Sequence, residues 1–506
     1  MKMRYRETAL RILVVLMLVV PLAGADQWNL GLAGSGARIE ANVVPGESPL
    51  SPTVLIIGGL EGEDGSTAVV RKELQTFEAL PQNRRPFRLI SIPVANPDGA
   101  KLHFLPTGIA YREDAESNAL WRWIGIHAPD VVLIAATADF GLAEALSQNV
   151  VAGVGRIQAR RVAPAAGFLQ SVPNPIAPSE AHREIDRRRG RSPREVAEEL
   201  AVTYGHDFDQ LTYLPGMSLI AQLRLGHTAD VAKLAAPYVD GSKDPLARAT
   251  SLTLAGHMVF AELAERTSDP RYIAAVRRAA DLGFTETGAM KESMPFHDEM
   301  SDSVFMAIPI LAKTGKFTGD RKYFDMAARH LAFMQKLVLR PDGLYRHSPL
   351  TDAAWSRGNA FPAMGLALTL SDFPTDHPQF GNVLREFQQH MATLARFQNE
   401  EGMWREVVDQ PGSYSEFSST AMIATSMLRG IRRGWLDRAV YQPIVDKAWQ
   451  AIVVRIGPDG QLVDVCESTN KQPTLKDYLN RAAILGRDPR GGGMALIFAT
   501  EMAGLQ

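Results

Sequence analysis

The chain has 506 residues, which favours two or three domains because a domain commonly holds about 100–200 residues. Hydrophobic residues make up 46% of the chain and charged residues 22%, a balance that excludes wholesale disorder and a multi-span membrane protein. The formal net charge is −2 with acidic and basic residues mixed, so we expect no nucleic-acid partner. Cys466 is the only cysteine, so stability must come from packing and not from an intrachain disulfide.

The first segment has the pattern of a secretory signal. Four basic residues between Lys2 and Arg11 precede an apolar run at 12–20, and Ala25 ends an Ala-Gly-Ala cleavage site. The apolar run is shorter than the roughly 20 residues of a membrane-spanning helix. We expect residues 1–25 to be removed, the protein to be periplasmic or extracellular, and no stable membrane insertion. An uncleaved membrane anchor is the alternative.

An α/β domain is predicted for residues 26–170. Apolar, β-rich runs at 53–57, 87–94 and 131–135 are each followed by a turn or loop. Runs that are apolar at every position are typical of strands covered on both faces, which indicates a mostly parallel sheet.

Residues 171–191 have the composition of a linker between domains. Several prolines precede a basic cluster at 187–191. Proline and charge at this density favour an exposed segment, so we interpret the cluster as solvated and assign it no function.

Residues 192–506 are predicted to be helical. Ser192 and Glu195 form a capping box around Pro193, which starts a helix. A motif at 267–272 recurs at 318–323 between helical stretches, and an acidic-Gly pair recurs at 342, 401 and 459. This repeat predicts helical hairpins of about 50–60 residues, in which apolar inner helices are wrapped by an outer layer. A closed α/α toroid is the favoured arrangement, and an open solenoid is the alternative.

Five motifs in the helical region occur in a fixed order, and together they resemble glycoside hydrolase families 88 and 105, the unsaturated glucuronyl and rhamnogalacturonyl hydrolases. The motifs are D-S-V-F-M-A-I-P-I-L-A from Asp302, G-L-Y-R-H ending at His347, W-S-R-G-N-A-F from Trp355, S-S-T-A from Ser418 and G-R-D-P-R-G from Gly486.

The resemblance implies a six-hairpin α/α barrel at 192–506 that acts on an oligosaccharide with a Δ4,5-unsaturated uronic acid at its end. In these families one Asp protonates C4 of the vinyl ether and then helps water to add at C5, without a metal or other cofactor. Asp302 matches that residue. Its alternative role is to cap the helix that follows, because Asp is a frequent N-cap.

Other residues of these motifs are expected to bind the sugar. A stacking face, a fixed cation and a second aromatic suit a sugar that carries a carboxylate. The expected substrate-binding residues are His347, Trp355, Arg357, Phe361, Met300, His257 and His297.

The sequence departs from the families at several positions. Ala360 and Phe361 replace the usual Gly and Trp, Met300 replaces a Trp, and the second Asp of an earlier inner helix is missing. Asp298, Glu299 or a histidine is the candidate to replace that carboxylate, although His257 is equally interpretable as a core residue.

Two other functions are compatible with this sequence. One is a β-glucuronidase or other uronosidase that pairs Asp302 with Glu299 or Glu416. The other is a non-catalytic glycan-binding protein of the cell envelope.

The N-terminal domain resembles a zinc carboxypeptidase of the M14 type that has lost its metal ligands. The resemblance rests on the segment from Gly58 to Asp64 and on an Asn-Pro-Asp-Gly motif from Asn96. Glu61 and Asp64 stand where that family has His and Glu, and the residues directly after the run at 131–135, Ala-Thr-Ala-Asp, include no His. We therefore expect an inactive accessory domain without zinc.

Overall fold

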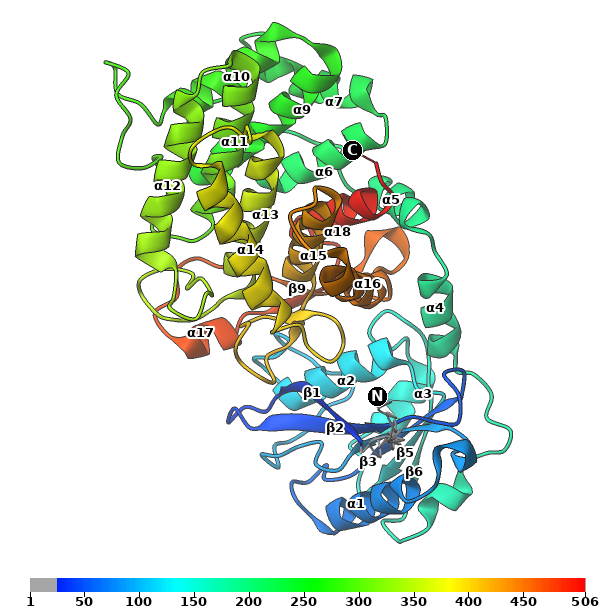
Figure 1. Cartoon of the computed structure of the whole chain (residues 1–506). Coiled ribbons are helices and arrows are strands. Elements are labelled where there is room, and N and C mark those ends of the chain that lie inside the picture. Colours follow the sequence, from blue (N-terminus) through cyan, green and yellow to red (C-terminus); the bar gives the residue numbers. More distant parts are fainter. Residues whose placement is uncertain (1–24, 506) are drawn as a thin grey trace, which may run out of the picture.

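The structure is a computed structural model that describes residues 25–505. It contains an N-terminal α/β unit and a larger helical unit, which lie against each other (Figure 1). The predicted signal segment at 1–24 lies outside the described residues. Within the described range, none of the helices combines the length and hydrophobicity that crossing a bilayer requires.

The N-terminal unit is built on a six-stranded mixed sheet with the order β1-β2-β4-β3-β5-β6. Strands β4, β3, β5 and β6 are parallel, whereas β1 and β2 join one side as antiparallel strands. The α/β prediction and its three strands are confirmed; β1, β2 and β6 are additional. The bounds are β1 (Asp26–Leu32), β2 (Arg38–Val44), β3 (Thr53–Ile57), β4 (Arg88–Ile92), β5 (Val131–Ala135) and β6 (Gln158–Val162).

Both faces of the sheet are covered, which explains why its central strands are apolar at every position. Alternate side chains of β3 pack on one face with α1 (Gly65–Glu78) and on the other with α2 (Ala115–His127). Helix α2 lies between the sheet and the helical unit (Figure 1), and its apolar residues belong to a core that continues into that unit. A shorter helix, α3 (Leu142–Gln148), precedes β6.

The segment interpreted as a solvated linker contains helix α4 (Glu180–Arg189) and two buried arginines, so that interpretation is wrong. Arg188 donates to the carbonyl oxygen of Val454 at 2.8 Å in the helical unit and to that of Gly153 at 2.7 Å in the N-terminal unit. Arg191 likewise donates to main-chain carbonyl oxygens of the helical unit. Buried guanidinium groups with such partners connect the two units.

The helical unit is a closed α/α barrel, because the last inner helix packs against both the first and its own predecessor. Inner helices are buried nearly all round, whereas outer helices bury one face. The closed ring contradicts the open-solenoid alternative. The inner helices are α6 (Tyr213–Arg224), α8 (Ser251–Gly256) continued by α9 (Met258–Thr267), α11 (Ser303–Thr318), α13 (Ser356–Asp372), α15 (Phe417–Arg432) and α18 (Pro489–Met502).

The outer layer and the short elements complete the unit. The outer helices are α5 (Pro193–Ala201), α7 (Thr228–Ala235), α10 (Pro270–Asp281), α12 (Lys322–Val338), α14 (Phe380–Ala395) and α16 (Arg438–Val453). The short elements are β7 (Trp404–Arg405), β8 (Ser415–Glu416), β9 (Leu462–Cys466), α17 (Leu475–Leu479) and β10 (Ala483–Gly486).

The sequence repeats mark the two ends of the barrel. The motif at 267–272 and its copy at 318–323 join an inner helix to the outer helix that follows it. The acidic-Gly repeats follow outer helices, and their glycines Gly343, Gly402 and Gly460 all have the left-handed backbone that favours glycine. The loops that begin at these glycines lead back to the first turns of inner helices.

Candidate functional site

The inner helices all begin at one end of the barrel, where polar side chains gather on their first turns. Tyr213 begins α6, Asp302 precedes α11, and Arg357 lies in the first turn of α13. Glu416 and Asp488 precede α15 and α18. Helix N-termini carry partial positive charge, so this end of the barrel favours an anionic ligand.

Asp302 occupies the N-cap position of α11, but its side chain accepts no capping hydrogen bond. Glu416 and Asp488 do accept such bonds, each from two main-chain N–H groups. The Asp302 carboxylate instead lies with Oδ1 3.5 Å from Nε2 of His347, and 14% of its side chain is exposed. The capping role left open by the sequence is therefore absent, and this carboxylate is available to a ligand.

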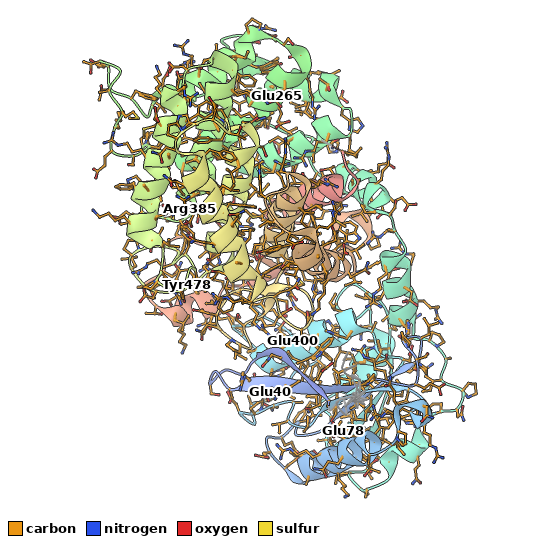
Figure 2. All side chains as sticks on the ribbon, viewed as in Figure 1. Glu40, Glu78, Glu265, Arg385, Glu400 and Tyr478 are labelled. Carbon is orange, nitrogen blue, oxygen red and sulfur yellow. The ribbon has the colours of Figure 1, made fainter. Side chains whose placement is uncertain are left out.

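His347 is held in a fixed orientation beside Asp302. Its carbonyl oxygen accepts from the N–H of Ser301 at 2.9 Å, and its N–H donates to Ala353 at 3.1 Å. The buried imidazole places Nδ1 2.8 Å from the hydroxyl of Tyr478 on α17. Burial raises the pKa of Tyr478 to about 12, so this phenol remains protonated. Tyr478 lies toward the end of the barrel that faces the N-terminal unit (Figure 2).

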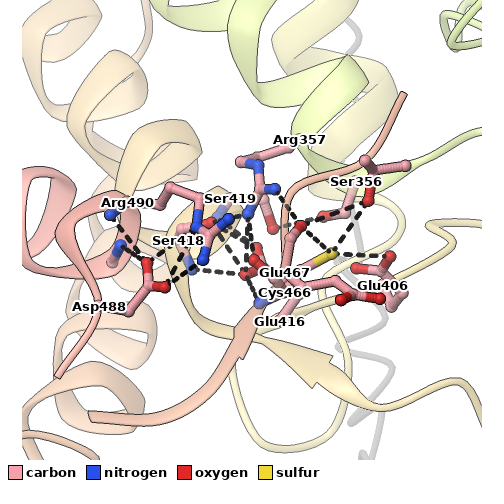
Figure 3. A network of polar contacts seen from close by, with 12 residues as sticks. Ser356, Arg357, Glu406, Glu416, Ser418, Ser419, Cys466, Glu467, Asp488 and Arg490 are labelled. Atoms are coloured by element: carbon pink, nitrogen blue, oxygen red, sulfur yellow. Dashed lines mark hydrogen bonds and ion pairs between the residues drawn. The ribbon is translucent and has the colours of Figure 1, made fainter. Parts of the chain in front are cut away.

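Arg357 is a buried cation with a fixed orientation (Figure 3). Nη1 donates to the carbonyl oxygen of Cys466 at 2.8 Å and to Oγ of Ser418 at 3.1 Å, and Nη2 donates to the carbonyl oxygen of Glu467 at 2.7 Å. The guanidinium lies 4.8 Å from the ring of Trp355. Of the five guanidinium N–H groups, these contacts leave one on Nη2 and the one on Nε, and Nε has no hydrogen-bond partner among the described residues.

Four buried polar atoms around Asp302 have no hydrogen-bond partner among the described residues. They are Oγ of Ser301, Oδ1 of Asp302, Nε2 of His347 and Nε of Arg357. Buried polar groups are rarely left unpaired in folded proteins unless a ligand or water completes them. This group is the structural reason for placing the candidate site here.

Two further carboxylates lie beneath Arg357. Glu416 is fully buried and accepts from the main-chain N–H groups of Ser418, Ser419 and Cys466, the last at 2.9 Å. Glu406 is also fully buried; its Oε1 accepts from the indole N–H of Trp355 at 3.0 Å, and its Oε2 is unpartnered among the described residues. Burial and the neighbouring Glu416 raise the pKa of Glu406 well above its usual value, which favours its protonated form.

The buried proton of Glu406 leads to a prediction about pH. Since the folded protein binds this proton more tightly than the unfolded chain, folding stability is fully present below the usual pKa of 4.5 and falls as pH rises toward the folded-state value. Glu406→Gln imitates the neutral acid and should reduce this loss. The melting temperature of the variant should fall less between pH 5 and pH 8 than that of the wild type. Identical pH slopes for both proteins would contradict the assignment.

Tyr213 contributes a hydroxyl from a part of the chain that the sequence motifs do not include. Its ring packs edge-on against Phe361 at 5.4 Å and Phe305 at 5.8 Å. Burial raises its pKa to about 12, while the charges of Arg357 and Asp302 act on it in opposite directions. Tyr213 therefore remains protonated close to both groups and can donate a hydrogen bond to a ligand.

The two predicted stacking residues are buried. Trp355 is 2% exposed behind Arg357 and 4.5 Å from the ring of His347; Phe361 is 1% exposed beneath Tyr213. In this arrangement both rings position the polar groups of the site. Whether either ring also meets a sugar stays a prediction.

The segment before Asp302 holds the remaining polar candidates in a strained backbone. Phe296, Asp298 and Glu299 all have positive φ, a costly conformation for non-glycine residues that is frequent at functional sites. Asp298 and Glu299 are exposed, whereas His297 and Met300 are half-buried. That Asp298 or Glu299 replaces the missing second carboxylate stays a prediction. Ligand contact by His297 or Met300 stays a prediction as well.

His257 lies at the break between α8 and α9, inside the barrel wall. Its Nδ1 lies 2.8 Å from the carbonyl oxygen of Thr253, and its ring meets Phe260 edge-on. Burial lowers its pKa to about 4, so it is neutral at neutral pH. None of the contacts found among the described residues joins His257 to Asp302, and its role in binding stays a prediction.

Two further residues of the Trp355 motif explain how α13 reaches the site. A Cβ at Gly358 would lie 3.0 Å from Oγ of Ser301, so glycine permits the close approach of α13 to the Asp302 segment. Asn359 both accepts from the N–H of Tyr345 at 2.8 Å and donates to its carbonyl oxygen at 2.9 Å. These contacts fasten the loop that carries His347 to α13.

The N-terminal unit contacts the loops that support Arg357. The ring of Tyr111 stacks on that of Tyr414 at 4.6 Å, and its hydroxyl donates to Asp464 on β9. Arg122 of α2 forms a buried ion pair with Asp464 at 2.6 Å. Asp464 is two residues from Cys466, whose carbonyl oxygen accepts from Arg357. The two units thus share one structural network with the site.

The fold and the site define an α/α barrel in which an acid, a histidine and an arginine meet at the N-termini of inner helices. The chain belongs to Glycosyl Hydrolase Family 88, whose family model matches residues 186–506.

Curated relatives show partial similarity. An unsaturated 3S-rhamnoglycuronyl hydrolase from Formosa agariphila is 28% identical over 179 residues, which cover 32% of this chain and 48% of that protein. The unsaturated rhamnogalacturonyl hydrolase YesR from Bacillus subtilis is 24% identical over 210 residues, which cover 40% of this chain and 59% of that protein. The chain thus spans about half the length of these two relatives.

Solved structures share the barrel fold. A glycosyl hydrolase family 88 protein from Bacteroides vulgatus has a TM-score of 0.52 at 18% identity, covering 62% of this chain and 100% of that chain. A possible member of the GH105 family from Klebsiella pneumoniae has a TM-score of 0.51 at 22% identity, covering 66% of this chain and 96% of that chain. The predicted α/α barrel is therefore confirmed.

Proposed function

We propose that this protein removes a Δ4,5-unsaturated uronic acid from the end of an oligosaccharide by hydrating its vinyl ether. The observation that carries the proposal is that Asp302, at the N-cap position of α11, makes no capping hydrogen bond and lies beside His347, at the same end of the barrel as Arg357. Membership of family 88 and the names of the two curated relatives support the same reaction class.

The geometry supports a role for each group. Arg357 and the helix N-termini provide positive charge for the substrate carboxylate. Asp302 in its acid form gives its proton to C4, and the resulting carboxylate takes a proton from the water that adds at C5. The hemiketal at C5 then opens by breaking its bond to the ring oxygen. This leaves a hemiacetal at C1, which collapses to an aldehyde and releases the next sugar as an alcohol. His347 and Tyr213 are placed to hold the substrate or the water.

The uronosidase alternative receives less support from the described residues. A glycosidase of that type needs a second carboxylate facing the sugar. Glu416 is fully buried with its oxygens engaged by main-chain N–H groups. Glu299 is exposed and lies 3.7 Å from Lys471. Glu416 is thus engaged by the main chain, and none of the contacts found among the described residues joins Glu299 to Asp302.

A screen of lyase-digested acidic polysaccharides tests the proposal. The ultraviolet absorbance of the unsaturated uronate should fall on addition of the protein, and the shortened saturated oligosaccharide should appear. Release of a saturated uronic acid from undigested chains, with no loss of absorbance, would favour the uronosidase. Tight binding without turnover across the screen would favour the non-catalytic glycan-binding alternative.

We propose that the N-terminal unit is an inactive carboxypeptidase-like accessory domain. The loop after β3 and the Asn96 motif lie together, since the side chain of Asn96 donates to the carbonyl oxygen of Leu60 at 2.8 Å. Asp64 is engaged as the N-cap of α1, and Glu61 is exposed. This donor set lacks the histidines that zinc prefers. One stoichiometric zinc in metal analysis of the purified protein would contradict the proposal.

Export is proposed on the N-terminal sequence alone. The charged, apolar and small-residue segments occur in the order that signal peptidase requires, with cleavage after Ala25. The mass of the native protein decides the cleavage site. An intact N-terminus would favour a membrane anchor.

A further inference from the structure

A cavity of about 170 Å³ lies between the N-terminal unit and the barrel, and its walls do not include Asp302. We call it the junction cavity. A wider groove of about 480 Å³ shares Arg88, His127 and Arg189 with it. The cationic and aromatic side chains that line the junction cavity are Trp28, Arg88, His127, Arg189, Lys447 and Arg455. Glu400, which lies at the junction of the two units (Figure 2), and Glu401 also line it.

The carboxylates of the junction cavity already have partners. Glu401 accepts a hydrogen bond from Arg455. Glu400 accepts from the main-chain N–H of Asn29 at 2.6 Å and pairs with Arg405 at 2.7 Å. Four cationic side chains thus line the cavity against two carboxylates, and neither carboxylate is committed to Arg88, Arg189 or Lys447.

Arg88 and Lys447 form no ion pair among the described residues, and Arg189 forms only a long one. The guanidinium of Arg88 lies over the ring of Trp28 at 5.5 Å, and the carboxylate paired with Arg189 is Asp186, at 3.8 Å and largely exposed. Burial and then the charge of Arg189 lower the pKa of Arg88, and the charge of Asp26 offsets part of this effect. Like charges that are held together in a partly buried cavity repel each other, and an anion between them relieves that repulsion.

The surroundings of His127 and Arg455, on the other wall of the cavity, also favour a bound anion. Burial lowers the pKa of His127 well below its usual value, and the charges of Arg455, Arg88 and Arg189 lower it further. Arg455 is 4% exposed, and its Nε has no hydrogen-bond partner among the described residues. A buried guanidinium N–H is costly without an acceptor, and an oxygen atom in the cavity provides one.

We propose that the junction cavity binds an oxyanion, with Arg88, Arg189 and Arg455 as its principal ligands. The cavity volume suits a group with the size of sulfate, phosphate or a carboxylate, since one water occupies roughly 30 Å³. The ligand comes either from free inorganic anions or from an acidic sugar, whose remaining atoms would extend into the wider groove along Trp28. Because Arg88 and Arg455 belong to different units, the bound anion adds a further connection to those made by Arg188 and by the Arg122–Asp464 pair.

Calorimetric titration of the full chain with sodium sulfate, in Tris chloride at constant ionic strength, tests the proposal. We expect one site per chain and a rise in melting temperature, since a ligand that binds only the folded state stabilises it. Arg88→Met keeps an apolar side chain over Trp28 but removes the charge, and it should raise Kd at least about tenfold. Arg71→Met removes an exposed arginine from the same unit and should leave Kd unchanged.

Parallel titrations locate the anion and identify its source. Lys447→Met is a second variant of the cavity and should weaken binding even if Arg88→Met folds poorly. A saturated uronic acid disaccharide that binds more tightly than sulfate, with the same dependence on Arg88, would identify an acidic sugar as the source. Weaker or no binding of the disaccharide would identify free anions. The proposal is overturned if sulfate produces no heat, or if Arg357→Met abolishes binding while Arg88→Met and Lys447→Met do not.

Discussion

Asp302→Asn is expected to lower the rate of vinyl ether hydration by about 10²–10⁴-fold or more, because removal of a general acid typically costs that much and one carboxyl group serves both proton transfers. Asn has a similar shape but neither protonates C4 nor accepts a proton from water. The Asp302 side chain makes no capping hydrogen bond, so folding has no need of its charge. Melting temperature and substrate binding should therefore remain close to the wild type.

The loss of ultraviolet absorbance under saturating substrate measures this effect. Asp320→Asn is the control: it removes an exposed carboxylate beyond the other end of α11 and should keep most of the activity. Near-normal turnover by a well-folded Asp302→Asn protein would refute the assignment. Asp298, Glu299 and His257 would then be the next positions to change.

Arg122→Met should lower the free energy of unfolding by about 3–5 kcal/mol, the usual cost of removing one partner of a buried ion pair. Arg122 and Asp464 lie 2.6 Å apart, and their side chains are 8% and 6% exposed. In the part of the chain that the structure describes, the variant leaves Asp464 buried with the hydroxyl of Tyr111 as its remaining side-chain donor. Because Asp464 lies on β9 close to the carbonyl oxygen that holds Arg357, activity should fall as well.

Urea unfolding of the wild type and three variants measures this coupling. The double variant with Arg122→Met and Asp464→Asn should recover part of the lost stability, since it removes the unpaired buried charge. Arg194→Met breaks an exposed ion pair with Glu198 and should change stability by no more than about 1 kcal/mol. Equal effects of Arg122→Met and Arg194→Met would show that the contact between the units contributes little.

Much of the fold could be predicted from the sequence because its signals are local. The capping box at Ser192 starts α5, and the glycines of the acidic-Gly repeats have the positive φ that glycine permits. The uniformly apolar runs form strands that are covered on both faces of the sheet. The five motifs in their fixed order predicted the correct family. The same motifs bring Asp302, His347 and Arg357 to one end of the barrel.

The interpretation of residues 187–191 as solvated was wrong, because the burial of a side chain depends on the surface that packs against it. A run of arginines has the same local signature in a solvated linker and in a helix between two units. Arg188 is buried because the carbonyl oxygens of Gly153 and Val454, far away in the chain, meet at its guanidinium. No property of the run itself distinguishes these outcomes.

By itself, therefore, the sequence determined an α/β unit followed by helical hairpins and the family, and it predicted Asp302 as the acid of the proposed reaction. Only the tertiary structure decided whether Asp302 caps its helix, because side-chain direction depends on contacts across the barrel. The tertiary structure also brought Tyr478 to His347 and Arg122 to Asp464, across 131 and 342 residues of chain. Pairings of that kind depend on how the inner helices close into a ring and how the N-terminal unit packs against it, and local sequence patterns carry no record of either.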